Sequence, residues 1–139
     1  MQRTFLVGID GGGTKTQVRI EDEKGELIGR AKGGPGNISS SVAQAWDSIH
    51  QAMNSILQSC QTTYDDPNNT FHVVFGMAGV EVGSARSDFL SVPHPNFKTR
   101  ILVSDAHIAC LGAHAGQPGA IIIIGTGVNG YQIEREHAQ

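Results

Sequence analysis

The sequence predicts an α/β fold on a mixed sheet, in which three antiparallel meander strands come first and helices then alternate with strands. Three observations carry this prediction. Apolar and polar residues alternate near the N-terminus, apolar residues at helical spacing follow over 42–60, and short apolar runs then alternate with further helical segments. Strands that alternate with helices are typical of sheets covered on both faces.

The meander is expected within the first 33 residues. Residues 4–9 are apolar and predict a mostly buried strand, and Val18 and Ile20 then alternate with polar neighbours. A turn signal over 22–25 precedes a third strand that starts at residues 27–28. Because the alternation starts directly after three glycines, these glycines should lie on a hairpin between antiparallel strands.

The remaining chain predicts alternating elements. Ser39, Ser40 or Ser41 caps a long helix, because apolar residues recur over 42–60 with the spacing of one helical face. Residues 61–70 form a polar loop. The later elements are expected as a strand over 71–75, a helix over 84–90, a strand over 100–103, a helix over 106–115, a strand over 120–124 and a return strand over 131–134.

Length and charge exclude several classes of protein. The chain has 139 residues, which suits a single domain, and a formal net charge of −3, which argues against a basic nucleic-acid surface. The longest apolar run has strand length, so no membrane association is expected. Two cysteines make no disulfide framework, which favours a reducing, cytoplasmic location.

Two glycine-rich turns follow predicted buried strands, over 10–16 and over 125–127. Glycines at strand ends allow backbone N–H groups to face an anion, although such turns can also be merely tight. Lys15 adds a cation, and the threonines of both turns add hydroxyl groups. Asp10 could hold a hydrated magnesium ion, which needs few carboxylates. The threonines are Thr14, Thr16 and Thr126.

Two familiar phosphate motifs fail in this context. Gly8 and Gly13 have P-loop spacing, but Thr14 stands where the lysine belongs and the following residues alternate as a strand. Gly125, Gly127 and Gly130 match a dinucleotide fingerprint, but a strand is predicted where that motif needs a helix. A phosphate loop inside a β-hairpin is the interpretation that remains.

The chain resembles the BadF/BadG/BcrA/BcrD-type ATPase family, within the superfamily of sugar kinases, actin and heat-shock chaperones. The resemblance rests on motifs that occur in the family's order. It implies a ribonuclease H-like or actin-like ATPase fold. The motifs are Gly-Ile-Asp-Gly-Gly-Gly-Thr-Lys-Thr over 8–16, Gly-Met-Ala-Gly over 76–79, Val-Ser-Asp-Ala-His over 103–107, Gly-Ala-His-Ala-Gly over 112–116 and Gly-Thr-Gly over 125–127.

The resemblance implies an ATP-dependent, magnesium-requiring kinase for an amino sugar such as N-acetylglucosamine or glucosamine. It implies that the 139 residues are the N-terminal half of a two-domain enzyme and are inactive alone. A homodimer is one compatible assembly, and the sequence does not decide the oligomeric state. The implied phosphate-binding residues are Gly11, Gly12, Gly13, Thr14, Lys15, Gly125, Thr126 and Gly127.

Asp105 follows a predicted strand, where α/β active sites collect, and the resemblance implies that it is the catalytic base and a sugar contact. Its position alone favours a cap for the next helix, and both roles are compatible. Asn37 is an implied sugar contact, because residues 34–37 resemble the family's sugar-contacting loop, although an asparagine there also suits a plain turn. Asn129 could also reach the sugar.

Val128 departs from the family pattern, which usually has serine there. A related branch of kinases and repressors often tolerates an apolar residue at this point and is the alternative family. The alternative function is a nucleotide-dependent switch that acts on a protein partner, because the fold alone does not decide between the two.

Overall fold

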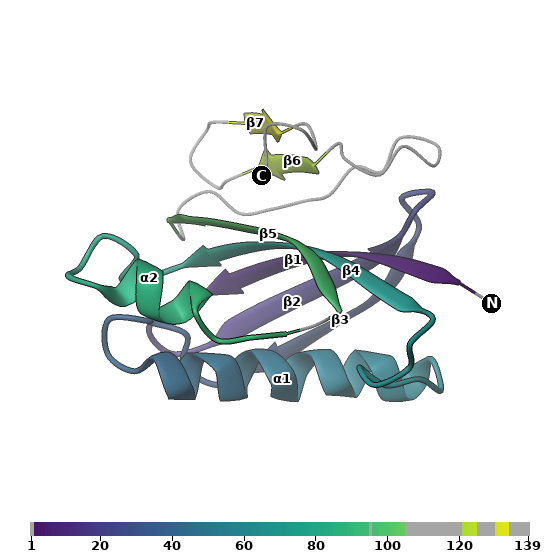
Figure 1. The fold of residues 1–139 in the computed structure, drawn as a ribbon, viewed down its shortest axis with the longest axis horizontal. Coiled ribbons are helices and arrows are strands. Elements are labelled where there is room, and N and C mark those ends of the chain that lie inside the picture. Colours follow the sequence, from purple (N-terminus) through teal and green to yellow (C-terminus); the bar gives the residue numbers. More distant parts are fainter. Residues whose placement is uncertain (1, 95, 105–120, 125–129, 134–139) are drawn as a thin grey trace.

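A five-stranded mixed sheet forms the centre of the fold (Figure 1). The computed structural model describes residues 2–94, 96–104, 121–124 and 130–133. The strand order is β3-β2-β1-β4-β5, and β1 pairs antiparallel with β2 and parallel with β4. The elements are β1 (Arg3–Gly11), β2 (Thr16–Asp22), β3 (Leu27–Gly33), α1 (Val42–Ser59), β4 (Asn69–Met77), α2 (Ala85–Leu90), β5 (Phe97–Ser104), β6 (Ile121–Ile124) and β7 (Gly130–Ile133).

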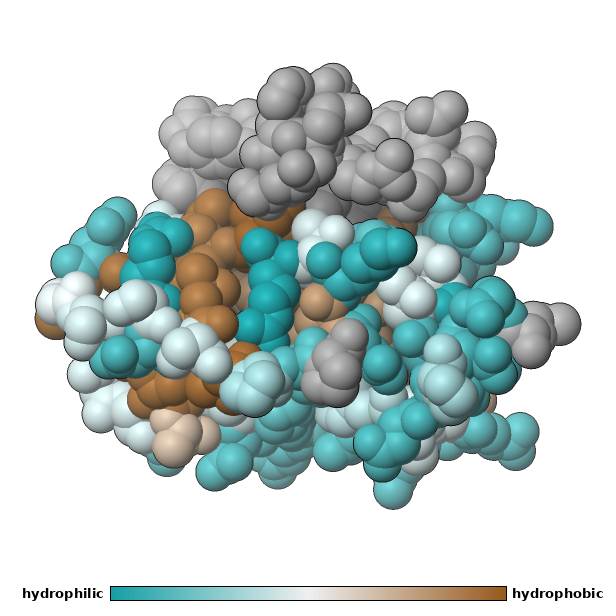
Figure 2. Space-filling view, in the orientation of Figure 1, coloured by the Kyte–Doolittle hydropathy of each residue, from teal (hydrophilic) through white to brown (hydrophobic). Residues whose placement is uncertain are grey.

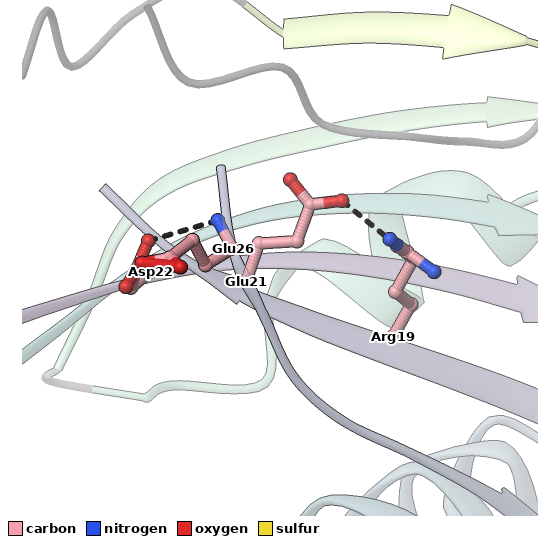
Figure 3. A network of polar contacts seen from close by, with 4 residues as sticks. All are labelled: Arg19, Glu21, Asp22 and Glu26. Atoms are coloured by element: carbon pink, nitrogen blue, oxygen red, sulfur yellow. Dashed lines mark hydrogen bonds and ion pairs between the residues drawn. The ribbon is translucent and has the colours of Figure 1, made fainter. Parts of the chain in front are cut away.

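The predicted meander is confirmed. β2 pairs antiparallel with both β1 and β3, and no helix begins between Thr14 and Arg19. The β2–β3 turn is held by Asp22, whose Oδ1 accepts the backbone N–H of Glu26 at 3.0 Å (Figure 3). The same oxygen accepts the backbone N–H of Lys24 at 2.8 Å. Gly25 has a φ of +86° in this turn, a conformation that glycine adopts without steric cost.

α1 lies along one face of the sheet (Figure 1) because its apolar residues recur on one side of the helix. Its N-terminus is capped as expected, since the Ser41 hydroxyl accepts the N–H of Gln44 at 3.0 Å. α2 packs beside it, and the rings of Trp46 and Phe89 stack with centroids 4.6 Å apart. The core between sheet and helices contains Phe5, Val7, Ile9, Val18, Ile20, Ile49, Met53, Phe71, Val73 and Phe75.

Several element boundaries differ from the predicted ones. β5 begins at Phe97, three residues before the expected start, because Phe97 pairs with Phe71 and buries its ring in the core. β4 begins at Asn69 inside the predicted polar loop, since the buried Asn69 amide donates to Thr62 Oγ1 and to the Thr63 carbonyl, both at 2.9 Å. The early start of β5 depends on a pairing partner that is distant in sequence. The early start of β4 depends on side-chain hydrogen bonds within a polar segment.

The C-terminal part of the description is limited to one hairpin. β6 pairs antiparallel with β7, which confirms the apolar strand near residue 121 and the return strand near residue 131. The predicted helix over 106–115 lies outside the described residues. Neither of the described helices combines the length and apolar character needed to cross a bilayer.

In the view of Figure 2 the described surface is mostly hydrophilic, with hydrophobic residues gathered on the side where α2 lies. Among the described residues, the large apolar side chains that are well exposed are Leu27 and Val82. Val82 belongs to the loop between β4 and α2, which starts at the carboxyl end of β4.

A group of aromatic and histidine rings packs where α1 meets the start of β5. His94 stacks on Phe97 with centroids 3.7 Å apart, and His50 shares a 3.1 Å hydrogen bond with the Tyr64 hydroxyl. The pKa of His94 is lowered to about 4, mainly by burial and also by the nearby His50 and Arg100, against an opposing effect of Asp65. Burial also lowers the pKa of His50, against Asp47.

We therefore expect the chain to lose stability in mild acid. A histidine whose pKa is lower in the folded than in the unfolded state stabilises the fold above about pH 6.5 and loses this contribution as pH falls toward 4. Urea midpoints measured from pH 7.5 to 4.5 should fall, and His94→Phe, which keeps the ring stacking, should weaken this fall. An unchanged pH dependence in His94→Phe would contradict the assignment to this histidine.

Candidate active site

The first glycine-rich turn closes the β1–β2 hairpin at the carboxyl end of β1. The N–H of Gly12 donates to the carbonyl of Lys15 at 2.8 Å, which closes the turn. Within the described part of the chain, the N–H groups of Gly13, Thr14 and Lys15 donate to no backbone carbonyl outside the strand pairing, and all three residues are exposed. These adjacent N–H groups and the Lys15 ammonium make an edge suited to an anion.

The glycines of this turn differ in what requires them. A Cβ at Gly11 would lie 2.5 Å from Met77 Cε and 2.9 Å from the Gly36 carbonyl oxygen, so Gly11 is required by packing. A Cβ at Gly12 would meet only the Lys15 carbonyl oxygen at 3.6 Å, and one at Gly13 would meet nothing within 4 Å. Neither of the two has a positive φ. Their lack of a side chain therefore serves no internal contact and leaves room for a ligand.

Gly13→Ala should separate folding from ligand binding. We expect an unchanged thermal midpoint, because the added methyl group meets open space. Inorganic triphosphate should bind about 10-fold or more weakly, because the methyl group stands where phosphate oxygens would approach the backbone. Differential scanning calorimetry and isothermal titration with triphosphate test both parts. An unchanged affinity for triphosphate would show that no phosphate approaches Gly13.

Main-chain hydrogen bonds join the hairpin turn to two other loops. The N–H of Gly36 donates to the Gly12 carbonyl at 2.8 Å, and the N–H of Ala78 donates to the Gly11 carbonyl at 2.8 Å. The N–H of Ile38 donates to the Ala78 carbonyl at 2.9 Å. The 34–38 loop is thus anchored on both sides of Asn37, to the hairpin turn and to the end of β4. We call these three connected segments, 11–15, 34–38 and 76–79, the loop junction.

Thr16 supports this junction instead of facing a ligand. Its side chain is fully buried, and its hydroxyl donates to the Gly34 carbonyl at 2.8 Å. The expectation that its hydroxyl is available to phosphate is therefore wrong, because β2 already begins at Thr16 and turns the side chain inward. Ser48 on α1 fixes the same loop through a 2.7 Å hydrogen bond to the Pro35 carbonyl.

The Asn37 side chain accepts three hydrogen bonds from Ser39 and Ser40. Its Oδ1 lies 2.9 Å from Ser39 N, 2.6 Å from Ser39 Oγ and 3.3 Å from Ser40 N. Gly79, with a φ of +87°, packs against the same amide, and any Cβ there would overlap Asn37 Oδ1. Asn37 is half-buried.

Asp10 lies on β1 just before the hairpin turn and lines, half-buried, a cavity of about 560 Å³. Three basic side chains, Arg19, Arg30 and Lys32, line the same cavity. Of these, Arg19 forms a 2.8 Å ion pair with the buried Glu21 (Figure 3). The described residues contain no group of three or more metal-ligating side chains. A single carboxylate fits magnesium that keeps most of its waters, and does not fit a metal held mainly by protein. The cavity is lined by Gly8, Asp10, Gln17, Val18, Arg19, Arg30, Ala31 and Lys32.

The other predicted site residues lie outside the described part of the chain, namely Asp105, Gly125, Thr126, Gly127 and Asn129. β5 runs parallel to β4 and ends at Ser104, which pairs with Met77, and Met77 in turn pairs with Gly11. The strand that precedes Asp105 therefore ends at the same edge of the sheet as the loop junction.

Sequence reasoning missed the roles of two residues that shape the junction, namely Ser39 and Ser48. Ser39 carries a local signal, because an asparagine often accepts from the backbone two residues later. Ser48 acts through a contact that is distant in sequence, so no local pattern indicates it. Gly79 lies in the Gly-Met-Ala-Gly motif, but its contact with Asn37 is visible only in the structure.

Comparisons with known proteins agree on one group. The profile of the BadF/BadG/BcrA/BcrD ATPase family matches residues 7–139. Glucosamine kinase GspK of Vibrio cholerae is 42% identical over 123 residues, which are 88% of this chain and 41% of that protein. The crystal structure of a protein described as a putative N-acetylglucosamine kinase from Chromobacterium violaceum matches with a TM-score of 0.64 and 25% identity, over 94% of this chain and 48% of that one. The chain spans less than half the length of both relatives.

Proposed function

Because the chain belongs to the BadF/BadG/BcrA/BcrD ATPase family, we propose that it is the N-terminal part of a kinase that transfers a phosphoryl group from ATP to an amino sugar. The observation that carries this proposal is the loop junction, in which main-chain bonds tie a hairpin turn suited to phosphate to the loop of Asn37. The comparisons support this proposal, because the two relatives are named a glucosamine kinase and a putative N-acetylglucosamine kinase.

For the described residues, the proposed roles in phosphate binding follow from the geometry of the hairpin turn. Gly11, Gly12 and Gly13 let phosphates approach the hairpin turn, and Thr14 and Lys15 supply a hydroxyl group and a positive charge. Gly12 serves through its small size, since its N–H is already bonded to Lys15. The second phosphate loop, Gly125, Thr126 and Gly127, is proposed from the family pattern.

Asp10 would hold Mg²⁺ through its water shell, and the ion would neutralise phosphate charge when bound. The residues of this chain position the reactants. Asn37 and Asn129 would bind the sugar, and Asp105 would accept the proton of the attacking hydroxyl as the new P–O bond forms and the bond to ADP breaks. Positioning and charge neutralisation supply most of the catalysis in such transfers.

We also propose a second domain that completes the nucleotide site, a cytoplasmic location, and no nucleic-acid or membrane partner. The length of the relatives supports the second domain. The net charge of −3 argues against a nucleic-acid partner, the strand-length apolar runs argue against a membrane partner, and the two cysteines support the location. A homodimer is compatible with the proposal, and the isolated 139 residues should be a poor catalyst because closure of two domains commonly completes a kinase site.

The test measures ADP release by the full-length protein with glucosamine, N-acetylglucosamine and non-amino hexoses, each with and without Mg²⁺. We expect turnover that requires both an amino sugar and Mg²⁺, and no sugar-dependent turnover by residues 1–139 alone. ATP hydrolysis that no sugar stimulates would contradict the kinase assignment. Strong turnover by the isolated chain would contradict the second domain.

A further inference from the structure

The orientation of the Asn37 amide is fixed by backbone chemistry. A backbone N–H can only donate, and two of them, on Ser39 and Ser40, lie 2.9 and 3.3 Å from the same side-chain atom. That atom must therefore be the oxygen, and the NH₂ group occupies the other branch of the amide.

The amide oxygen has no capacity left for a ligand. It already accepts from Ser39 N, Ser39 Oγ and Ser40 N, and Gly79 closes over it so tightly that a side chain there would overlap it. The Nδ2 group, in contrast, donates to no acceptor in the described part of the chain. Asn37 can thus offer hydrogen-bond donors to its surroundings and cannot offer an acceptor.

We propose that Asn37 meets the sugar as a hydrogen-bond donor only, and that Ser39 is the positioning residue that holds the amide in this orientation. The inference rests on the proposed kinase function and specifies the substrate atom involved. A donor requires an acceptor, so Asn37 faces a hydroxyl or acetamido oxygen. The ammonium group of an unacetylated amino sugar only donates and cannot be its partner.

The placement of Asn37 supports a role toward the substrate. Gly36 and Ile38, its two neighbours, are bonded to Gly12 and Ala78, so main-chain bonds fix Asn37 beside the proposed phosphate loop. A sugar held here would lie near the phosphoryl group that it receives. The Ser39 hydroxyl makes the shortest of the three bonds to the amide, at 2.6 Å, and should restrict its rotation most.

Ser39→Ala in the full-length protein tests the positioning role, and Ser40→Ala is the matched control. Both serines are exposed, but the Ser40 hydroxyl makes no described hydrogen bond to Asn37. We expect Ser39→Ala to raise the sugar KM about 3- to 10-fold, while kcat and the KM for ATP stay near normal, and Ser40→Ala to change none of them. Equal effects of the two variants, or none, would overturn the positioning role.

Asn37→Asp tests the donor. The carboxylate keeps the acceptor used by Ser39 and Ser40, so the loop should stay folded, but it removes the NH₂ donors. We expect kcat/KM to fall about 10-fold or more for both glucosamine and N-acetylglucosamine. A rise for glucosamine would overturn the proposal, because a carboxylate attracts an ammonium group. If the unsubstituted protein showed no sugar-dependent turnover, the kinase proposal itself would be overturned. If the unsubstituted protein turned over normally and Asn37→Asp had the same kcat/KM, only this inference would be overturned.

Discussion

If the proposed function holds, Asp105→Asn should lower the kcat of the full-length protein by about 10²–10⁴-fold, the scale of general-base catalysis. The amide keeps the shape and most of the hydrogen-bonding capacity of the carboxylate, but it cannot accept the proton of the attacking hydroxyl. β5 ends at Ser104, at the same end of the sheet as the loop junction, and this placement of the preceding strand motivates the choice of Asp105. Sugar and ATP should still bind, since the lost interaction matters mainly in the transition state.

Asp10→Asn is the matched comparison, because it removes a carboxylate on the side of the hairpin turn that faces the cavity. It should weaken magnesium binding, so a higher Mg²⁺ concentration should partly restore its activity and should not restore Asp105→Asn. The test is to measure the kcat of both variants, and the dependence of their activity on Mg²⁺ concentration. A near-normal kcat in Asp105→Asn would assign that carboxylate to helix capping, and identical magnesium responses would remove the division of roles.

Gly33→Ala should destabilise the fold by about 3 kcal/mol or more, the upper range for an overpacked contact. A Cβ at Gly33 would overlap the carbonyl oxygen of Ser48 and lie 3.0 Å from its carbonyl carbon. These are backbone atoms of α1, which cannot rotate away as a flexible side chain can. β3 and α1 would have to separate, which would also displace the Ser48 hydroxyl that holds the Pro35 carbonyl.

Gly13→Ala is the control for this prediction, since its added methyl group meets no atom within 4 Å. Urea midpoints of both variants should therefore fall only for Gly33→Ala. Its activity should fall as well, because displacement of α1 moves the loop that carries Asn37. If Gly33→Ala kept the midpoint of the unsubstituted protein, the contact of β3 with the backbone of α1 would be looser than described.

Local patterns predicted the elements of this fold well. The alternation at Val18 and Ile20 was sufficient for the hairpin, because a half-buried strand leaves a period of two in the sequence. The apolar spacing from Val42 predicted α1 for the same kind of reason. The early start of β5 at Phe97 could not be predicted, since it depends on pairing with β4.

The site was predictable only in part. The glycines of the hairpin turn are conspicuous in the sequence, but only the structure separates Gly11, which packing requires, from Gly13, which no internal contact requires. Thr16 and Thr14 look equivalent in sequence, yet one is buried and bonded to Gly34 while the other is exposed. Such distinctions depend on what the rest of the chain places against each residue.

The parallel pairing of β1 with β4 has a consequence for synthesis on the ribosome. The β1–β2 hairpin needs only neighbouring residues, whereas β1 acquires its second partner only once residues 69–77 have emerged. Until then one edge of β1 exposes unpaired backbone groups, which can pair with other chains. Stalled nascent chains in which residue 69 has not yet emerged from the ribosome should therefore be protease-sensitive and should tend to associate. Stalled chains in which Met77 has emerged should be protected from the protease. Protease digestion of such stalled chains would measure the length at which the central strand becomes protected.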